Sequence, residues 1–201
     1  MLKKIAVIGP QNSGKTTSLY RVGYEIKSNT KVIGMGHELA REQMELTKLG
    51  FLGQLTLLHR QMERELRLEE HYTNILTDRS VFDSIAYCKQ LHEEGRVTVS
   101  DFCMLCDMID KWVTIHPYYA IIYLTPLPIE DDPQRGPTKT NILKHQLEMN
   151  AQFEGVTHMI MEEYPDTQFY AVTVDDKKKR TSEVLQIVDA LFFKKGEHII
   201  L

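Results

Sequence analysis

The order of apolar and helix-length segments predicts an α/β fold, in which a doubly wound, parallel, five-stranded sheet carries helices on both faces. Five short apolar segments recur along the 201 residues, and a segment of helix length follows each of them. Strands that are apolar almost throughout are typical of parallel sheets covered on both faces. A glycine-rich loop directly after the first apolar segment is the third observation, because such loops join a strand to a helix in doubly wound sheets.

The alternating segments give the expected elements in chain order. The expected strands are Lys4–Ile8, Lys31–Met35, Asn74–Thr77, Ala120–Leu124 and Phe169–Val174. The expected helices are Lys15–Lys27, Glu38–Leu49, Gly53–His71, Val81–Glu94, Ser100–Ile115, Thr140–Tyr164 and Ser182–Lys194. Ser100 and Ser182 are suitable capping residues for the helices that they begin. The proline-rich segment 126–139 is expected to form a lid or a disordered connection.

Length, charge and cysteine content restrict the class of protein. A chain of 201 residues without a linker-like stretch is expected to form a single domain, 1–201. No apolar run is long enough to span a bilayer, so a membrane protein is not expected. The formal net charge of −4 does not favour a nucleic-acid partner, although a local basic groove is still possible. Cys103 and Cys106 are expected on a buried helix face rather than in a metal or redox site. Reduced thiols and the lack of a signal peptide favour a cytoplasmic protein.

The glycine-rich loop Gly9–Thr16 fits the pattern G-x-x-x-x-G-K-[ST] and lies between an expected strand and the start of an expected helix. Its glycines permit backbone conformations in which successive N–H groups point into one concavity at the helix N-terminus. Lys15 is expected to reach the β- and γ-phosphates of ATP, and the Thr16 hydroxyl to coordinate Mg²⁺. The residues expected to bind ATP are Gly9, Asn12, Ser13, Gly14, Lys15, Thr16 and Thr17.

The third expected strand is followed by an acid, Asp78, and then by Arg79 and Ser80. The carboxyl ends of parallel strands face the ligand crevice, so Asp78 is expected near the phosphate loop, where it could hold Mg²⁺ directly or through water. The planar fork of Arg79 matches phosphate oxygens. The alternative is that Asp78 caps the helix expected from Val81, and the two roles are compatible.

Together, the phosphate loop, the run Glu38–Glu42 and the acid after the third strand resemble the P-loop nucleoside and nucleotide kinases. The resemblance is greatest to the nicotinamide riboside kinase type, whose motifs include E-x-A-R-E, His-Arg-Gln and Ala-aromatic-Cys-Lys-Gln. The matching residues here are Glu38–Glu42, His59–Gln61, Asp78, Ala86–Gln90 and, in the lid, Asp131–Arg135. Asp78-Arg79-Ser80 instead resembles the Asp-Arg-[Ser/Tyr] motif of deoxynucleoside and thymidylate kinases. The resemblance implies a P-loop kinase fold with a lid.

Phosphoryl transfer requires charge stabilisation more than covalent chemistry, so the candidate catalytic residues are groups that surround the phosphoryl group or take up a proton. They are Lys15, Glu38, Asp78 and Arg135. Glu38 is the first candidate for the base that a hydroxyl acceptor needs, whereas a phosphate acceptor needs a cationic clamp. The candidate acceptor-binding residues are Glu38, Arg41, Arg60 and Arg79. The basic run Lys177–Arg180 is expected to be a solvated turn or part of a loop over the adenine.

The expected function is the transfer of the γ-phosphate of ATP, with Mg²⁺, to a small nucleoside- or nucleotide-like acceptor. A kinase of a modified base or sugar hydroxyl in DNA would share every catalytic part and add a basic groove. A regulatory P-loop ATPase would need a positioned water in place of an acceptor pocket. The net charge of −4 disfavours the DNA reading, and the run Glu38–Glu42 disfavours the regulatory one.

Overall fold

The core of the molecule is a sheet of five parallel strands in the order β2-β3-β1-β4-β5. The computed structural model describes residues 2–28, 32–37, 49–127 and 139–193. The strands are β1 (Lys3–Ile8), β2 (Gly34–Gly36), β3 (Asn74–Asp78), β4 (Ala120–Leu124) and β5 (Gln168–Val172). The register pairs Val7 with both Asp78 and Ile122, so the carboxyl ends of the three central strands meet at one edge of the sheet. The predicted fold class is confirmed.

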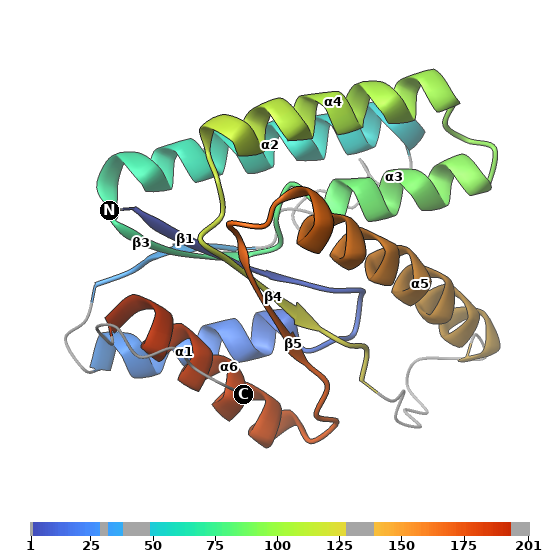
Figure 1. Cartoon of the computed structure of the whole chain (residues 1–201). Helices are drawn as coiled ribbons and strands as arrows, with labels where there is room; N and C mark the ends of the chain where they lie inside the picture. Colours follow the sequence, from blue (N-terminus) through green and yellow to red (C-terminus); the bar gives the residue numbers. More distant parts are fainter. Residues whose placement is uncertain (1, 29–31, 38–48, 128–138, 194–201) are drawn as a thin grey trace.

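Helices cover both faces of the sheet (Figure 1). They are α1 (Lys15–Ser28), α2 (Gly50–His71), α3 (Asp83–Glu93), α4 (Val99–Ile115), α5 (Lys139–Glu163) and α6 (Lys177–Phe193). Ile5 and Val7 of β1 pack with apolar residues of α1 and α6, whereas Ala6 and Ile8 pack with those of α2, α3, α4 and α5. Successive side chains of a strand point to opposite faces, so each strand contributes to both cores.

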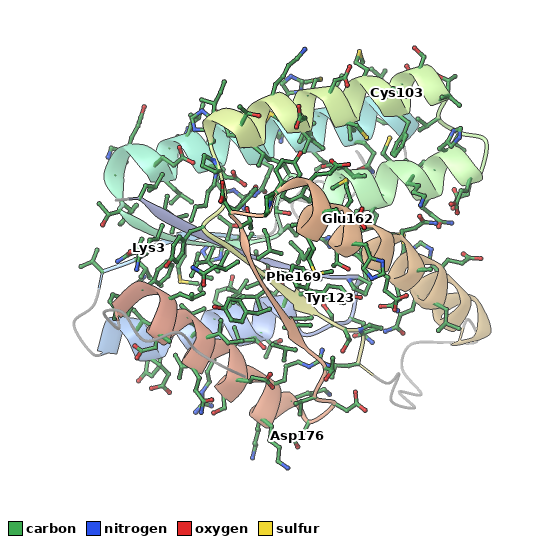
Figure 2. The ribbon with its side chains drawn as sticks, in the orientation of Figure 1. Lys3, Cys103, Tyr123, Glu162, Phe169 and Asp176 are labelled. Atoms are coloured by element: carbon green, nitrogen blue, oxygen red, sulfur yellow. The ribbon has the colours of Figure 1, made fainter. Side chains whose placement is uncertain are left out.

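Helices α2 and α3 begin at Gly50 and Asp83 rather than at the predicted Gly53 and Val81. Two predicted helix caps were also wrong, because other residues supply them. Helix α6 begins at Lys177 rather than Ser182, since the Asp176 carboxylate accepts a hydrogen bond of 2.8 Å from the Lys179 N–H at its first turn (Figure 2). The run Lys177–Arg180 is therefore helical and not a turn. Similarly, α4 is capped by Thr98, whose hydroxyl accepts from the Asp101 N–H at 3.1 Å.

A buried ionic network supports the sheet beneath α2 and α4. Lys4, the second residue of β1, is 1% exposed, and its ammonium lies 2.8 Å from carboxylate oxygens of both Glu65 and Glu69. The Tyr118 hydroxyl donates to Glu65 at 2.6 Å and accepts from the Val81 N–H at 3.0 Å. Since Val81 follows β3 closely, this network reaches from the core to the segment that carries Asp78 and Arg79.

Two predicted segments lie largely outside the residues that the structure describes. The helix expected at 38–49 lies outside the described residues except for Leu49. The lid expected at 126–139 also lies outside them, except for its first two residues and its last.

Cys103 is exposed on α4 (Figure 2), so the prediction of a buried face was wrong for this residue, whereas Cys106 is half-buried against the core. None of the helices in the described part of the chain combines the length and the apolar character needed to cross a bilayer.

Candidate functional site

The loop between β1 and α1 has the backbone geometry of a phosphate cradle. Gly9 and Gly14 have φ values of +142° and +80°, and Asn12 has a φ of +64°. A Cβ atom at Gly9 would lie 2.3 Å from the Leu124 carbonyl oxygen, so only glycine allows β1 and β4 to approach here. The loop passes directly into α1, whose first backbone bond joins the Ser18 N–H to the Gly14 oxygen at 3.0 Å. Loop and helix N-terminus together can bind an anion.

Lys15 brings a positive charge into this loop. The side chain is 5% exposed, and its ammonium donates to the Gly9 and Pro10 carbonyls at 2.7 Å each and to the Ser13 hydroxyl at 3.1 Å. These acceptors belong to the loop itself, so the ammonium lies across the cradle. Phosphate oxygens could take the place of such acceptors with little movement of the side chain.

Thr16 and Asp78 meet at the end of the loop. The Thr16 hydroxyl donates to the Asp78 carboxylate at 2.6 Å, and Asp78 is 2% exposed at the carboxyl end of β3. Helix α3 begins at Asp83 and its N-cap position is Phe82, so Asp78 does not occupy the N-cap. A hydroxyl and a carboxylate oxygen are the ligand types that Mg²⁺ takes in phosphotransferases, where phosphates and water complete the coordination. The residues therefore fit the ion.

Arg79 has a strained backbone next to this pair. Its φ is +79°, and among the described residues Arg79 and Asn12 are the non-glycine residues with positive φ. The conformation is held by the Arg79 N–H, which donates to the Val7 oxygen at 3.0 Å, and by the Arg79 carbonyl, which accepts from Thr77 at 2.8 Å and from Gln61 at 3.3 Å. Backbone strain of this kind is concentrated at functional sites. Both strained residues lie at the carboxyl edge of the sheet.

The Arg79 side chain enters a pocket between α2 and α3. One guanidinium nitrogen donates to Asp83 at 3.2 Å and to the Tyr87 hydroxyl at 3.0 Å. The other Asp83 oxygen accepts from the Ser80 N–H at 2.9 Å and from the Ser80 hydroxyl at 3.0 Å. Burial raises the pKa of Asp83, and the charges of Arg79 and Lys15 oppose that rise. The pocket is lined by Gln54, Leu57, Gln61, Arg79, Ser80, Asp83, Ser84 and Tyr87.

The remaining predicted site residues are distributed as follows. Thr17 is exposed on α1, and Arg60 is exposed on α2 and does not line the pocket. Glu38, Arg41 and Arg135 lie outside the described residues.

Of the residues that line the pocket, only Arg79 was predicted from the sequence; the others were missed, among them Asp83, Gln61 and Tyr87. Asp83 follows Ser80 at the spacing of a helix-capping pattern, which is a usable signal. Gln61 and Tyr87 belong to the motifs that carry the family resemblance, yet the sequence alone assigned no role to either. Their place in the pocket depends on how α2 and α3 pack, with the Gln61 amide reaching the Arg79 carbonyl.

Comparisons with known proteins show what shares this fold. No family model and no curated protein matches the sequence. Among solved structures, a NadR protein in complex with NR matches with a TM-score of 0.68 and 16% identity over 99% of this chain. A deoxyadenosine kinase from M. mycoides with dCMP and dCDP matches with a TM-score of 0.67 and 18% identity over 93% of this chain and 99% of that one. The same kinase with dATP gives a TM-score of 0.62 at 17% identity, again covering 92% and 99% of the two chains.

These similarities apply to the whole described sheet and its helices. The chain spans only 53% of the NadR protein, but nearly the full length of the deoxyadenosine kinase. At such low identity the comparison establishes the fold and leaves activity to be argued from the site. The chain therefore shares the fold of these solved structures, with its parallel sheet in the order β2-β3-β1-β4-β5.

Proposed function

We propose that this protein transfers the γ-phosphate of ATP to a hydroxyl group of a nucleoside-like small molecule. The observation that carries the proposal is the convergence of Lys15, Thr16 and Asp78 at the carboxyl edge of the sheet, with a pocket beside them. The Thr16–Asp78 contact of 2.6 Å brings the end of the phosphate loop to the strand end that leads into the pocket. A phosphate cradle and an adjoining acceptor pocket are the two parts that a phosphotransferase needs.

The charges in the pocket favour an uncharged acceptor. A nucleoside monophosphate needs a cationic clamp, but the Arg79 guanidinium is matched by the Asp83 carboxylate at 3.2 Å. The other lining residues are amides, hydroxyls and apolar side chains, which suit a planar, polar and neutral group. The exposed Arg60 lies outside the lining. An uncharged nucleoside therefore suits the charges of this pocket better than a nucleoside monophosphate does.

Each group of residues in the site has its own proposed role in phosphoryl transfer. The backbone N–H groups of the loop and the Lys15 ammonium bind phosphate oxygens and stabilise the charge that develops on them. Thr16 and Asp78 would hold Mg²⁺, which when bound neutralises phosphate charge and orients the phosphates. Arg79 and Asp83 shape the acceptor pocket. Glu38 is the candidate that takes the hydroxyl proton, and Arg135 the candidate that approaches the phosphates from the lid; both roles rest on the sequence.

The test measures steady-state phosphorylation with ATP and Mg²⁺ for nucleosides, their 5′-monophosphates and DNA as separate acceptors. We expect turnover with at least one nucleoside, and much lower kcat/KM with its monophosphate. Glu38→Gln should lower kcat by roughly 10²–10⁴-fold if a proton must leave the acceptor. An inert Glu38→Gln together with a large rise in acceptor KM for Arg79→Ala would show a monophosphate acceptor instead. Phosphate release that is independent of any acceptor would favour a regulatory ATPase.

A further inference from the structure

Arg180 is a buried arginine near the phosphate loop that the proposed chemistry does not use. It belongs to the first turn of α6 and is 1% exposed. Burial lowers the pKa of its guanidinium, whereas the nearby carboxylates of Asp175 and Glu183 raise it. An arginine stays protonated at neutral pH even so, because its ordinary pKa exceeds about 12. A full positive charge therefore lies inside the protein at this position.

The guanidinium connects three separate segments. One nitrogen donates to the Ser13 carbonyl at 2.8 Å and to the Thr125 carbonyl at 2.5 Å. A second donates to the Thr125 hydroxyl at 3.2 Å, and the third donates to the Val174 carbonyl at 2.7 Å. Ser13 is in the phosphate loop, Thr125 follows β4 and Val174 lies beyond β5. All four acceptors are uncharged oxygen atoms, and the planar fork can reach them together.

The Ser13 contact fixes the direction of one loop peptide. In a trans peptide the carbonyl oxygen and the N–H of the next residue point in opposite directions. No cis peptide occurs among the described residues, so the Gly14 N–H points away from Arg180. The Arg180 stem also passes close to Gly14, because a Cβ built on that glycine would lie 4.0 Å from the Arg180 Cδ atom. Arg180 lies behind the loop, and the Gly14 N–H is directed to the other side.

We propose that Arg180 is a positioning residue for nucleotide binding, which holds the Ser13–Gly14 peptide so that the loop presents its N–H to a phosphate. This inference rests on the proposed function of the loop as a nucleotide site. The same guanidinium couples the loop to the ends of β4 and β5. A residue that only anchored α6 would affect unfolding but not the affinity of the folded protein for phosphate.

The test measures the dissociation constants of ADP and of inorganic tripolyphosphate at 25 °C, together with thermal unfolding. Arg180→Gln is expected to weaken both ligands by about tenfold or more, because a charge-assisted contact that orders the loop is lost. Arg180→Lys keeps the charge but loses the fork, so it should also bind both ligands more weakly than wild type. Lys4→Met is the matched control, since it removes a buried cation that contacts Glu65, Glu69 and His116 but no loop residue. It should lower the unfolding midpoint without changing either dissociation constant.

Several outcomes would overturn the proposal. Wild-type affinity in a folded Arg180→Gln variant would make Arg180 a structural anchor only. Wild-type affinity of Arg180→Lys for both ligands would show that the positive charge matters and the orientation of the peptide does not. If Arg180→Gln weakened the binding of ADP but not of tripolyphosphate, the effect would lie at the adenine. If Arg180→Gln does not fold, Thr125→Val removes one of the four acceptors, and an unchanged tripolyphosphate affinity there counts against the proposal.

The same measurements separate this inference from the proposed function. A wild-type protein that binds ADP but transfers no phosphate would contradict the function and leave the role of Arg180 intact. A wild-type protein that binds neither ADP nor tripolyphosphate would overturn both.

Discussion

Replacing Asp78 by Asn changes one buried oxygen to an amide nitrogen and removes the negative charge from the Thr16 contact. The 2.6 Å separation is that of a hydrogen bond to an ionised group. Such a bond contributes about 1.5–3 kcal/mol and a neutral one about 0.5–1.5 kcal/mol, so we expect to lose about 1 kcal/mol of folding free energy. For a domain of this length that lowers the thermal midpoint by about 2–4 °C. The fold should survive.

The effect on magnesium is expected to be much larger. Loss of a carboxylate at or next to a metal ion typically reduces metal affinity by roughly 10–100-fold. The assay follows ATP-dependent turnover and ADP binding as Mg²⁺ is titrated, with thermal unfolding measured in parallel. The midpoint of the Mg²⁺ titration should rise by that factor, and activity should partly return at high Mg²⁺.

Ser18→Ala is the matched control for this variant. Ser18 lies on α1 two residues beyond the loop, and its hydroxyl bonds to the Thr181 hydroxyl at 3.2 Å, so its loss should cost a similar amount of stability. Its Mg²⁺ titration should equal that of wild type. An Asp78→Asn titration that superimposes on wild type would refute the metal role and leave Asp78 as a structural partner of Thr16.

Four further predictions test other parts of the account. Lys15→Ala should reduce phosphoryl transfer on the order of 10²-fold or more while the protein stays folded, and unchanged turnover would remove the lysine from the phosphate site. Asp83→Asn should remove the negative charge that lies 3.2 Å from the Arg79 guanidinium, so nucleoside monophosphates should inhibit more strongly than they inhibit wild type; equal inhibition constants would contradict our charge argument. Arg135→Ala should lower kcat more than it raises the KM for ATP, and a change in ATP affinity alone would speak against a lid arginine. Burial alone would raise the pKa of Glu69, but contacts with Lys4 and His116 hold that pKa below its ordinary value of 4.5. The ionised Glu69 carboxylate therefore stabilises the folded protein above pH 4.5, and this stabilisation is lost as the pH falls through the lowered pKa. Glu69→Gln should therefore flatten the loss of unfolding free energy below about pH 4.5, and a parallel acid titration would disprove this contribution.

The fold class was predictable because local signals and the sheet topology agree. Apolar strands such as Ala120–Leu124 are buried on both faces, as their composition indicates. The glycine loop pattern predicted a strand before the loop and a helix after it. The register of β1 and β3, which pairs Val7 with Asp78, places Asp78 beside this loop. Helix starts were less predictable, because Asp176 and Thr98 are as suitable for capping as the serines that follow them.

The parts that sequence could not predict depend on packing between distant segments. Arg180 stands in a run of exposed basic residues, and nothing local distinguishes the one that turns inward to Ser13 and Thr125. Lys4 stands beside Lys3 at the start of β1, and nothing in the sequence shows that Lys4 is the one buried against Glu65 and Glu69 of α2. The Arg79–Asp83 pair lies in a pocket whose shape depends on the packing of α2 against α3. The roles of Glu38, Arg41, Arg60 and Arg135 remain predictions.

A single-turnover experiment tests most directly whether the protein transfers the γ-phosphate of ATP to a nucleoside. The enzyme is in excess over γ-labelled ATP, and the nucleoside is saturating. We predict that the label passes to the nucleoside, with close to one label transferred per ATP consumed, and that Lys15→Ala transfers none on the same timescale. Label that appears as inorganic phosphate at the same rate with and without nucleoside would contradict it.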